Sequence, residues 1–130
     1  MTRYLLDSDA VIDYLNSYAP TVSLLRALAE RGEVLCTCDV VVAEVHSGLA
    51  AEDRHNAIEF LQSALYLVTS QRAAQQAGEW RYTYARRGVT LLVGDALVAA
   101  TAHEHAATLI TGNKRHYPME EVFLLQLSRA

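Results

Sequence analysis

The sequence predicts an α/β fold in which a central parallel β-sheet lies between two layers of helices. Short apolar runs alternate along the 130 residues with longer segments that repeat apolar residues at helical spacing. Strands separated by helices pair in parallel, because each crossover returns the chain to the same end of the sheet. A chain that is 52% hydrophobic and 20% charged has a globular composition, and its length suits one domain. We therefore expect a single domain over residues 1–130.

The first half of the chain predicts two strands and three helices. An apolar run that ends in Asp7 reads as a buried strand, and the residues after it repeat at helical spacing. Gly32 is typical of a helix end and Asp39 of a helix cap. The expected strands are residues 4–6 and 33–38, and the expected helices are residues 10–15, 21–31 and 40–49.

The second half continues the alternation. Gly88 ends a long segment rich in Ala and Gln, and Gly94 and Asp95 open an Ala-rich helix. Residues 89–92 are too few to assign. The expected helices are residues 52–65, 70–87 and 94–105, the expected strands are residues 66–68, 108–111 and 122–125, and residues 112–118 form a loop.

Charge and cysteine content exclude several classes of protein. Eleven Lys and Arg against fifteen Asp and Glu give a net charge of −4, so non-specific binding to a polyphosphate is not expected to dominate. Two cysteines, Cys36 and Cys38, are too few for a disulfide framework or a four-ligand zinc site. Residues 1–20 lack the features of an export signal, and no apolar segment is long enough to span a membrane. We expect a cytoplasmic protein.

Several acids and one amide fall where strands end or helices begin. In parallel α/β sheets such positions share one crevice beyond the carboxyl ends of the strands. Clustered carboxylates repel one another unless a cation neutralises them, and oxygen ligands favour Mg²⁺, with Mn²⁺ as a substitute. Such an ion activates water for phosphodiester hydrolysis. The residues concerned are Asp7, Asp9, Glu44, Asp95 and Asn113.

Most of these residues also have a purely structural interpretation. Asp7 and Asp95 stand where N-caps are common, and Asn113 is a typical turn residue. Glu44 is harder to explain, because it interrupts a valine-rich run where an unpaired carboxylate would be costly to bury. Asp13 reads as a solvated helix acid, and Asp9 as either a ligand or a cap.

Four motifs together resemble the PIN-domain family, in particular the VapC-type toxin ribonucleases of bacterial toxin–antitoxin pairs. They are Leu5-Leu6-Asp7-Ser8-Asp9-Ala10-Val11-Ile12-Asp13, Val42-Ala43-Glu44, Gly94-Asp95-Ala96-Leu97-Val98-Ala99-Ala100-Thr101-Ala102, and Thr111-Gly112-Asn113 with His116-Tyr117. The resemblance covers essentially the whole chain and implies a PIN-like, Rossmann-like fold over residues 1–130. It also implies an Mg²⁺-dependent endoribonuclease toxin.

The resemblance assigns roles to individual residues. Asp7, Glu44 and Asp95 match the acidic metal ligands, and Asn113 takes the place of a fourth acid, which leaves one or two metal ions open. Thr111 and Ser8 match supporting hydroxyls, and Asp9 is a variant that adds negative charge. Cys38 stands where Ser or Thr is usual, with Asp39 as the substitute cap.

Two basic pairs are candidate contacts for RNA phosphates: Arg86 with Arg87, and Lys114 with Arg115. Solvated helix ends favour the same residues, because cations suit the helix dipole there. No histidine is assigned to catalysis.

The resemblance implies a cognate antitoxin whose helix fills an apolar groove and whose Arg or Lys reaches the acids. It also implies a homodimer, and a larger toxin–antitoxin assembly is compatible with it. Core packing is an alternative role for the apolar residues that would line such a groove. These residues are Tyr14, Tyr18, Leu49, Leu61 and Leu65.

Two other functions compete with the nuclease. Asp7-Ser8-Asp9 after an apolar strand fits the nucleophile turn of a haloacid-dehalogenase-type phosphohydrolase, but no Asp follows Asp95 to complete such a site. A PIN-like binding module without turnover is the other alternative, although acids occupy all of the core positions. The sequence leaves open which RNA is cut.

Overall fold

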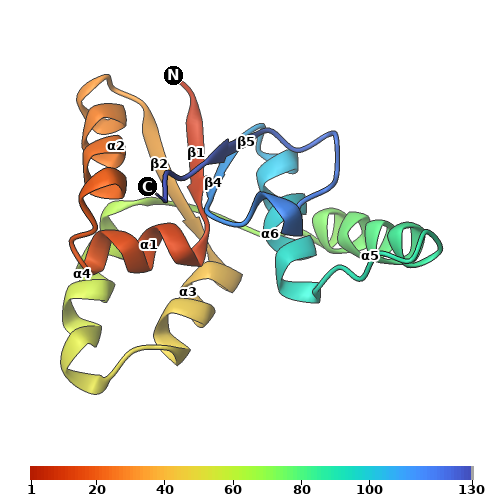
Figure 1. The fold of residues 1–130 in the computed structure, drawn as a ribbon, viewed down its shortest axis with the longest axis horizontal. Coiled ribbons are helices and arrows are strands. Elements are labelled where there is room, and N and C mark those ends of the chain that lie inside the picture. Colours follow the sequence, from red (N-terminus) through yellow and green to blue (C-terminus); the bar gives the residue numbers. More distant parts are fainter. Residues whose placement is uncertain (130) are drawn as a thin grey trace.

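The computed structural model describes residues 1–129 and confirms the three-layer α/β/α fold (Figure 1). Five parallel strands form one sheet in the order β3-β2-β1-β4-β5. The strands are β1 (Arg3–Leu6), β2 (Val34–Cys38), β3 (Leu65–Leu67), β4 (Thr108–Thr111) and β5 (Leu124–Gln126). The helices are α1 (Ser8–Leu15), α2 (Ala19–Glu30), α3 (Asp39–Ser47), α4 (Arg54–Ser63), α5 (Gln71–Ala85) and α6 (Val93–Glu104), with short 3-10 helices η1 (Ala51–Asp53) and η2 (Lys114–His116).

The strands stand in the middle of Figure 1, with α1 to α4 on one side and α5 and α6 on the other. Helix α5 packs along α6 and projects away from α1 and α3. None of the helices in residues 1–129 is long and apolar enough to cross a membrane.

The centre of the sheet is apolar and buried. Leu5 and Leu6 on β1 and Leu109 and Ile110 on β4 are at most 1% exposed, as expected for parallel strands covered on both faces. The register pairs Leu5 with Leu109 and Leu6 with Ile110. The Asp7 amide then donates to the Ile110 carbonyl at 2.9 Å. The carboxyl ends of β1 and β4 therefore lie side by side.

Several helix boundaries agree with the sequence. Gly32 and Gly88 follow α2 and α5 with φ of +78°, a conformation that glycine adopts without strain. Ser70 caps α5, because its hydroxyl accepts a hydrogen bond from the Ala73 amide at 3.1 Å. Helix α2 begins at Ala19 rather than at residue 21, since Pro20 suits the first helical turn.

Three predicted elements are wrong in extent. The helix expected over residues 52–65 is η1 followed by α4, because Leu65 pairs with Cys36 as the first residue of β3. The last strand is β5 rather than residues 122–125, since Leu124 is the residue that pairs with Leu109. The loop expected over residues 112–118 contains the single turn of η2.

Helix α3 forms despite its valines because it buries only one side. Val41 and Val45 are fully buried, four positions apart on one helical face. Cys38 is the N-cap residue of the helix, and burial raises the pKa of its thiol to about 11 against the backbone amides of Val41 and Val40. Asp39 is the first helical residue, and its Oδ1 accepts from the Val40 amide at 2.8 Å. Asp39 therefore bonds a helix amide from inside the first turn rather than from the cap position.

Candidate active site

The strand order reverses between β1 and β4. The chain places β2 and β3 on one side of β1 and then β4 and β5 on the other. In parallel α/β sheets a ligand binds beyond the carboxyl ends of the strands at such a reversal. Asp7 follows β1 and Thr111 ends β4, so both residues lie at this position.

Asp7 is a buried carboxylate held by donors from three segments. It is the only buried side chain among the Asp, Glu, Lys, Arg and His of residues 1–129, with 7% of its surface exposed. Its Oδ1 accepts from the Ser8 amide at 2.9 Å, which caps α1. Its Oδ2 accepts from the hydroxyls of Thr111 at 2.8 Å and Tyr117 at 2.7 Å. These donors offset the cost of burying the charge, so Asp7 is a fixed acid as well as a helix cap.

Glu44 on α3 and Asp95 in the first turn of α6 lie beside Asp7. A Cβ atom added to Gly94 would be 3.4 Å from Glu44 Oε2, so α6 begins close to the Glu44 carboxylate. The Tyr117 hydroxyl is 3.5 Å from Asp95 Oδ1 and also donates to Asp7. We call Asp7, Asp9, Glu44 and Asp95 the acidic cluster.

The members of the acidic cluster influence one another electrostatically. Burial and the Asp7 charge raise the pKa of Glu44, and a hydrogen bond from the Ser8 side chain opposes this. Burial and Asp7 also raise the pKa of Asp95, against the effects of His116 and Tyr117. Burial, followed by Asp7, raises the pKa of the Tyr117 hydroxyl far above its usual range, so this hydroxyl remains a donor.

Asp9 faces the turn that follows β4. Its Oδ2 accepts from the Gly112 amide at 2.8 Å and from the Asn113 side-chain amide at 3.3 Å. The Asn113 backbone amide donates in turn to the Thr111 hydroxyl at 3.1 Å. Burial and the Asp7 charge raise the pKa of Asp9. The structure therefore brings Asp9 and Asn113 together, and Asn113 reaches the cluster through Asp9.

One expectation about an acid is wrong, and the place of Glu44 explains how its helix avoids burying a charge. Asp13 is not a solvated helix acid: it is 18% exposed, accepts from the Thr21 hydroxyl at 2.8 Å and pairs with Arg129. Glu44 is not buried among the valines of α3, because the helix turns Val41 and Val45 inward and leaves Glu44 on its exposed side.

The basic pairs occupy different places. Lys114 and Arg115 are exposed on η2, directly after Asn113 and next to His116, whose Nδ1 is 3.4 Å from Asp95 Oδ2. Arg86 and Arg87 follow α5, at the end of the helix that projects away from α1 and α3 (Figure 1). Their guanidinium groups lie over tyrosine rings, 4.1 Å from the Tyr82 centroid and 5.2 Å from that of Tyr84.

Sequence reasoning missed three residues that contact the acidic cluster. Tyr117 and His116 stand next to each other in a motif quoted for the resemblance, and that position was the available signal. Arg129, which lies 3.6 Å from Asp9, follows the last strand, and nothing in the sequence pattern points to it.

The oxygen donors of the cluster suit a hard divalent cation. Asp9 Oδ1 is buried and has no hydrogen-bond partner in residues 1–129, and a cation would satisfy it. No three His, Cys, Asp or Glu side chains of the described chain are already arranged to hold a metal ion. The residues thus fit a metal ion in their chemistry.

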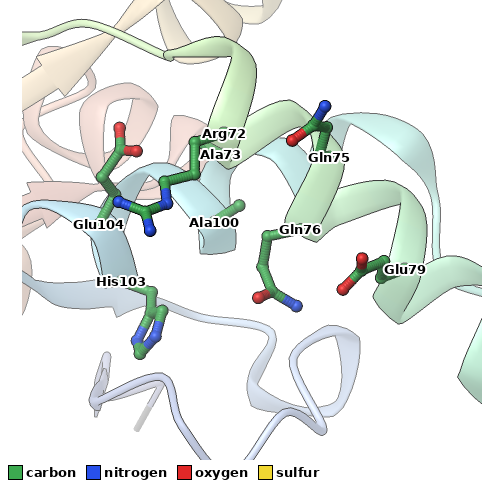
Figure 2. Close-up of a pocket in the computed structure, with 8 residues that line it drawn as sticks. All are labelled: Arg72, Ala73, Gln75, Gln76, Glu79, Ala100, His103 and Glu104. Carbon is green, nitrogen blue, oxygen red and sulfur yellow. The ribbon is translucent and has the colours of Figure 1, made fainter.

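A second polar region lies between α5 and α6, where a cleft of about 510 Å³ opens (Figure 2). Arg72, Gln76 and Glu79 reach into it from α5, and His103 and Glu104 come from α6. We call this region the α5–α6 cleft. Arg72, Glu79 and His103 are exposed there, unlike Asp7.

The fold and the acidic cluster at its strand reversal define a class of α/β proteins with a carboxylate site. The family model of the PIN domain matches residues 4–122. This chain therefore belongs to the PIN domain family.

Two similar proteins are Mycobacterium tuberculosis ribonucleases. Ribonuclease VapC19 of strain H37Rv is 28% identical over 117 residues, covering 88% of this chain and 92% of the relative. Ribonuclease VapC10 of the same strain is 29% identical over 117 residues, covering 90% of this chain and 87% of the relative.

Solved structures share the fold. The Rickettsia felis VapBC2 structure, bound to a DNA fragment from its promoter, matches with a TM-score of 0.83 and 21% identity, covering 98% of this chain and 100% of that chain. The DNA-bound VapBC of Salmonella typhimurium matches with a TM-score of 0.82 and 17% identity, covering 97% and 98%.

Proposed function

We propose that this chain is a divalent-metal-dependent endoribonuclease, the toxin of a toxin–antitoxin pair. The observation that carries the proposal is the buried Asp7 carboxylate, held by two hydroxyls beside Glu44 and Asp95. Membership of the PIN domain family and the ribonuclease relatives support it. The same membership argues against the phosphohydrolase alternative.

Asp7, Glu44 and Asp95 would hold Mg²⁺, or Mn²⁺ in its place. When bound, the ion supplies an activated water and positive charge beside the phosphate. Thr111 and Tyr117 fix the Asp7 oxygens, and the Ser8 side chain bonds Glu44. Asn113 and Asp9 order the turn after β4. These roles keep the acids oriented.

RNA would approach the acidic cluster along η2. Lys114 and Arg115 are exposed there and carry the charge that RNA phosphates need. Arg86 and Arg87 lie at the end of α5, where they would meet a more distant part of an RNA.

We further propose that residues 1–130 form one PIN domain that works in the cytoplasm as a homodimer with a cognate antitoxin. The similar VapBC structures are toxin–antitoxin complexes, which supports such a partner and a larger assembly. The apolar residues expected to line its groove, of which Leu65 lies on β3, are partly available to it. Tyr14 stacks on Phe60 at 4.4 Å and Leu61 is buried, whereas Leu65 is 43% exposed.

The test is RNA cleavage with added Mg²⁺ by the wild-type chain and by Asp7→Asn and Asp95→Asn. We expect cleavage to fall at least a hundredfold in both variants while circular dichroism shows a folded protein. Glu79→Gln, which removes a charge from the α5–α6 cleft, is the matched control and should cut normally. Undiminished cutting by both aspartate variants would defeat the assignment. A wild type that cuts no RNA and binds no Mn²⁺ at millimolar concentrations would instead favour the inert binding module.

A further inference from the structure

Arg129 reaches back from beyond β5 to the first helix. Its Nη1 bonds Asp13 Oδ2, and its Nη2 lies 3.6 Å from Asp9 Oδ2. Asp13 also accepts from the Thr21 hydroxyl, which holds that carboxylate in place from α2. Arg129 therefore ties the chain after β5 to two acids of α1 that are one helical turn apart.

The same guanidinium packs on the turn after β4. A Cβ atom on Gly112 would collide with Arg129 Nη2 and would lie 2.7 Å from Asp9 Oδ2. The Gly112 amide donates to that same Asp9 oxygen. A side chain at position 112 would therefore displace the Arg129–Asp9 pair, and the pair and the turn form one packed unit.

This unit adjoins the proposed metal ligands. The turn begins at Thr111, whose hydroxyl donates to Asp7 and accepts from the Asn113 amide. Asp9 follows Asp7 by two residues and adds a second negative charge near it. Arg129 is the cation within 4 Å of Asp9, so it balances that charge.

We propose that Arg129 is a positioning residue and a built-in counter-charge of the acidic cluster. It holds Asp9 on the Gly112–Asn113 turn and limits the affinity of the cluster for a divalent cation. The second statement rests on the proposed function, and the first does not.

Mn²⁺ titration by calorimetry tests the counter-charge. Removing a fixed positive charge beside acids tightens cation binding, so Arg129→Gln should bind Mn²⁺ about threefold to tenfold more tightly than wild type. Arg129→Lys keeps the charge and should bind as wild type does. Asp9→Asn should weaken binding, and the Asp9→Asn, Arg129→Gln double variant should return close to wild type. Arg26→Gln, on the exposed side of α2, removes the same charge as a control.

Hydrogen exchange tests the positioning without any metal. The Gly112 amide should exchange at least tenfold faster in Arg129→Gln than in wild type, with thermal unfolding showing that both proteins are folded. Arg129→Lys, which keeps the charge but loses the planar fork, should lie between them.

The outcomes separate the two proposals. Weaker or unchanged Mn²⁺ binding in Arg129→Gln, with cleavage intact in wild type, overturns the counter-charge and leaves the nuclease standing. A wild type that neither binds Mn²⁺ nor cuts RNA overturns the nuclease and the counter-charge, and Gly112 exchange then decides the positioning role. Equal Gly112 exchange in all of these proteins overturns that role.

Discussion

The acidic cluster and the α5–α6 cleft hold charge in opposite ways. Asp7 is buried and bonded by an amide and two hydroxyls from separate parts of the chain. The α5–α6 cleft is lined by Arg72, Glu79, His103 and other polar groups that are largely exposed to water. Water screens exposed charges, whereas a buried carboxylate acts on its neighbours at close range. A cleft lined with exposed polar groups is therefore weaker evidence for an active site than one buried, hydrogen-bonded carboxylate.

Metal removal should separate the two regions most strongly. EDTA should abolish RNA cleavage, and Mn²⁺ should restore it. An ion at about one hundred times its Kd stabilises the fold by about 2.7 kcal/mol. The melting temperature should therefore rise by several degrees when the ion is added. Glu79→Gln should keep this shift and Asp7→Asn should lose it. The same shift in both variants would place the ion elsewhere.

Tyr117→Phe should have the next largest effect. The variant lacks the hydroxyl that donates to Asp7 Oδ2 and Asp95 Oδ1. A buried charged acceptor that loses one of its donors destabilises the site by about 1–3 kcal/mol. Cleavage should fall about tenfold to a hundredfold, measured as kcat/KM. Tyr84→Phe is the matched control, because its hydroxyl bonds the exposed Pro118 carbonyl at 3.2 Å. Equal losses in both variants would contradict the role of Asp7.

Thr111→Val should weaken cleavage about tenfold, because the valine keeps the shape of the side chain and loses the donor to Asp7. Thr101→Val is its counterpart in α6, where the hydroxyl donates to the Leu97 carbonyl at 2.8 Å. Both variants should lower the free energy of unfolding by about 1 kcal/mol in urea. Only Thr111→Val should slow cleavage, and a similar loss with Thr101→Val would argue against a local effect.

In the metal-free protein, Glu44→Gln should give the smallest effect on stability, separate from the loss of metal binding expected of a proposed ligand. The folded chain binds the Glu44 proton more tightly than the unfolded chain, because burial and Asp7 raise its pKa above 4.5. The metal-free protein therefore loses stability as pH rises from the Glu44 pKa of the unfolded chain through that of the folded chain. The loss persists at neutral pH. Glu44→Gln should raise the melting temperature at pH 7 by on the order of 1 °C and flatten its pH dependence. Glu30→Gln, an exposed acid of α2, should do neither.

Local patterns were sufficient to predict the centre of the fold. The run that ends in Asp7 and the run over residues 108–111 are buried strands because their residues are apolar throughout. An acid directly after such a strand must lie at the carboxyl end of the sheet, which is why Asp7 could be placed before the structure was known. The division between α4 and β3 depends on pairing between Leu65 and Cys36, which no local pattern contains.

The partners of the acids were less accessible to sequence reasoning. Tyr117 lies in a segment without periodicity, and its contact with Asp7 depends on how η2 folds over the end of β4. Arg129 contacts Asp9 and Asp13 only because β5 returns beside β4. The place of Glu44 relative to its valine neighbours depends on the rotation of α3, which is set by packing of Val41 and Val45.

The hydroxyl of Tyr117 and the carboxylate of Asp7 are 110 positions apart in the chain. A ribosome making this protein releases Asp7, Glu44 and Asp95 well before it releases Tyr117. An unfinished chain would carry the three acids without the hydroxyl that holds the first of them. The order of synthesis thus delays assembly of these groups until the segment that carries Tyr117 has left the ribosome.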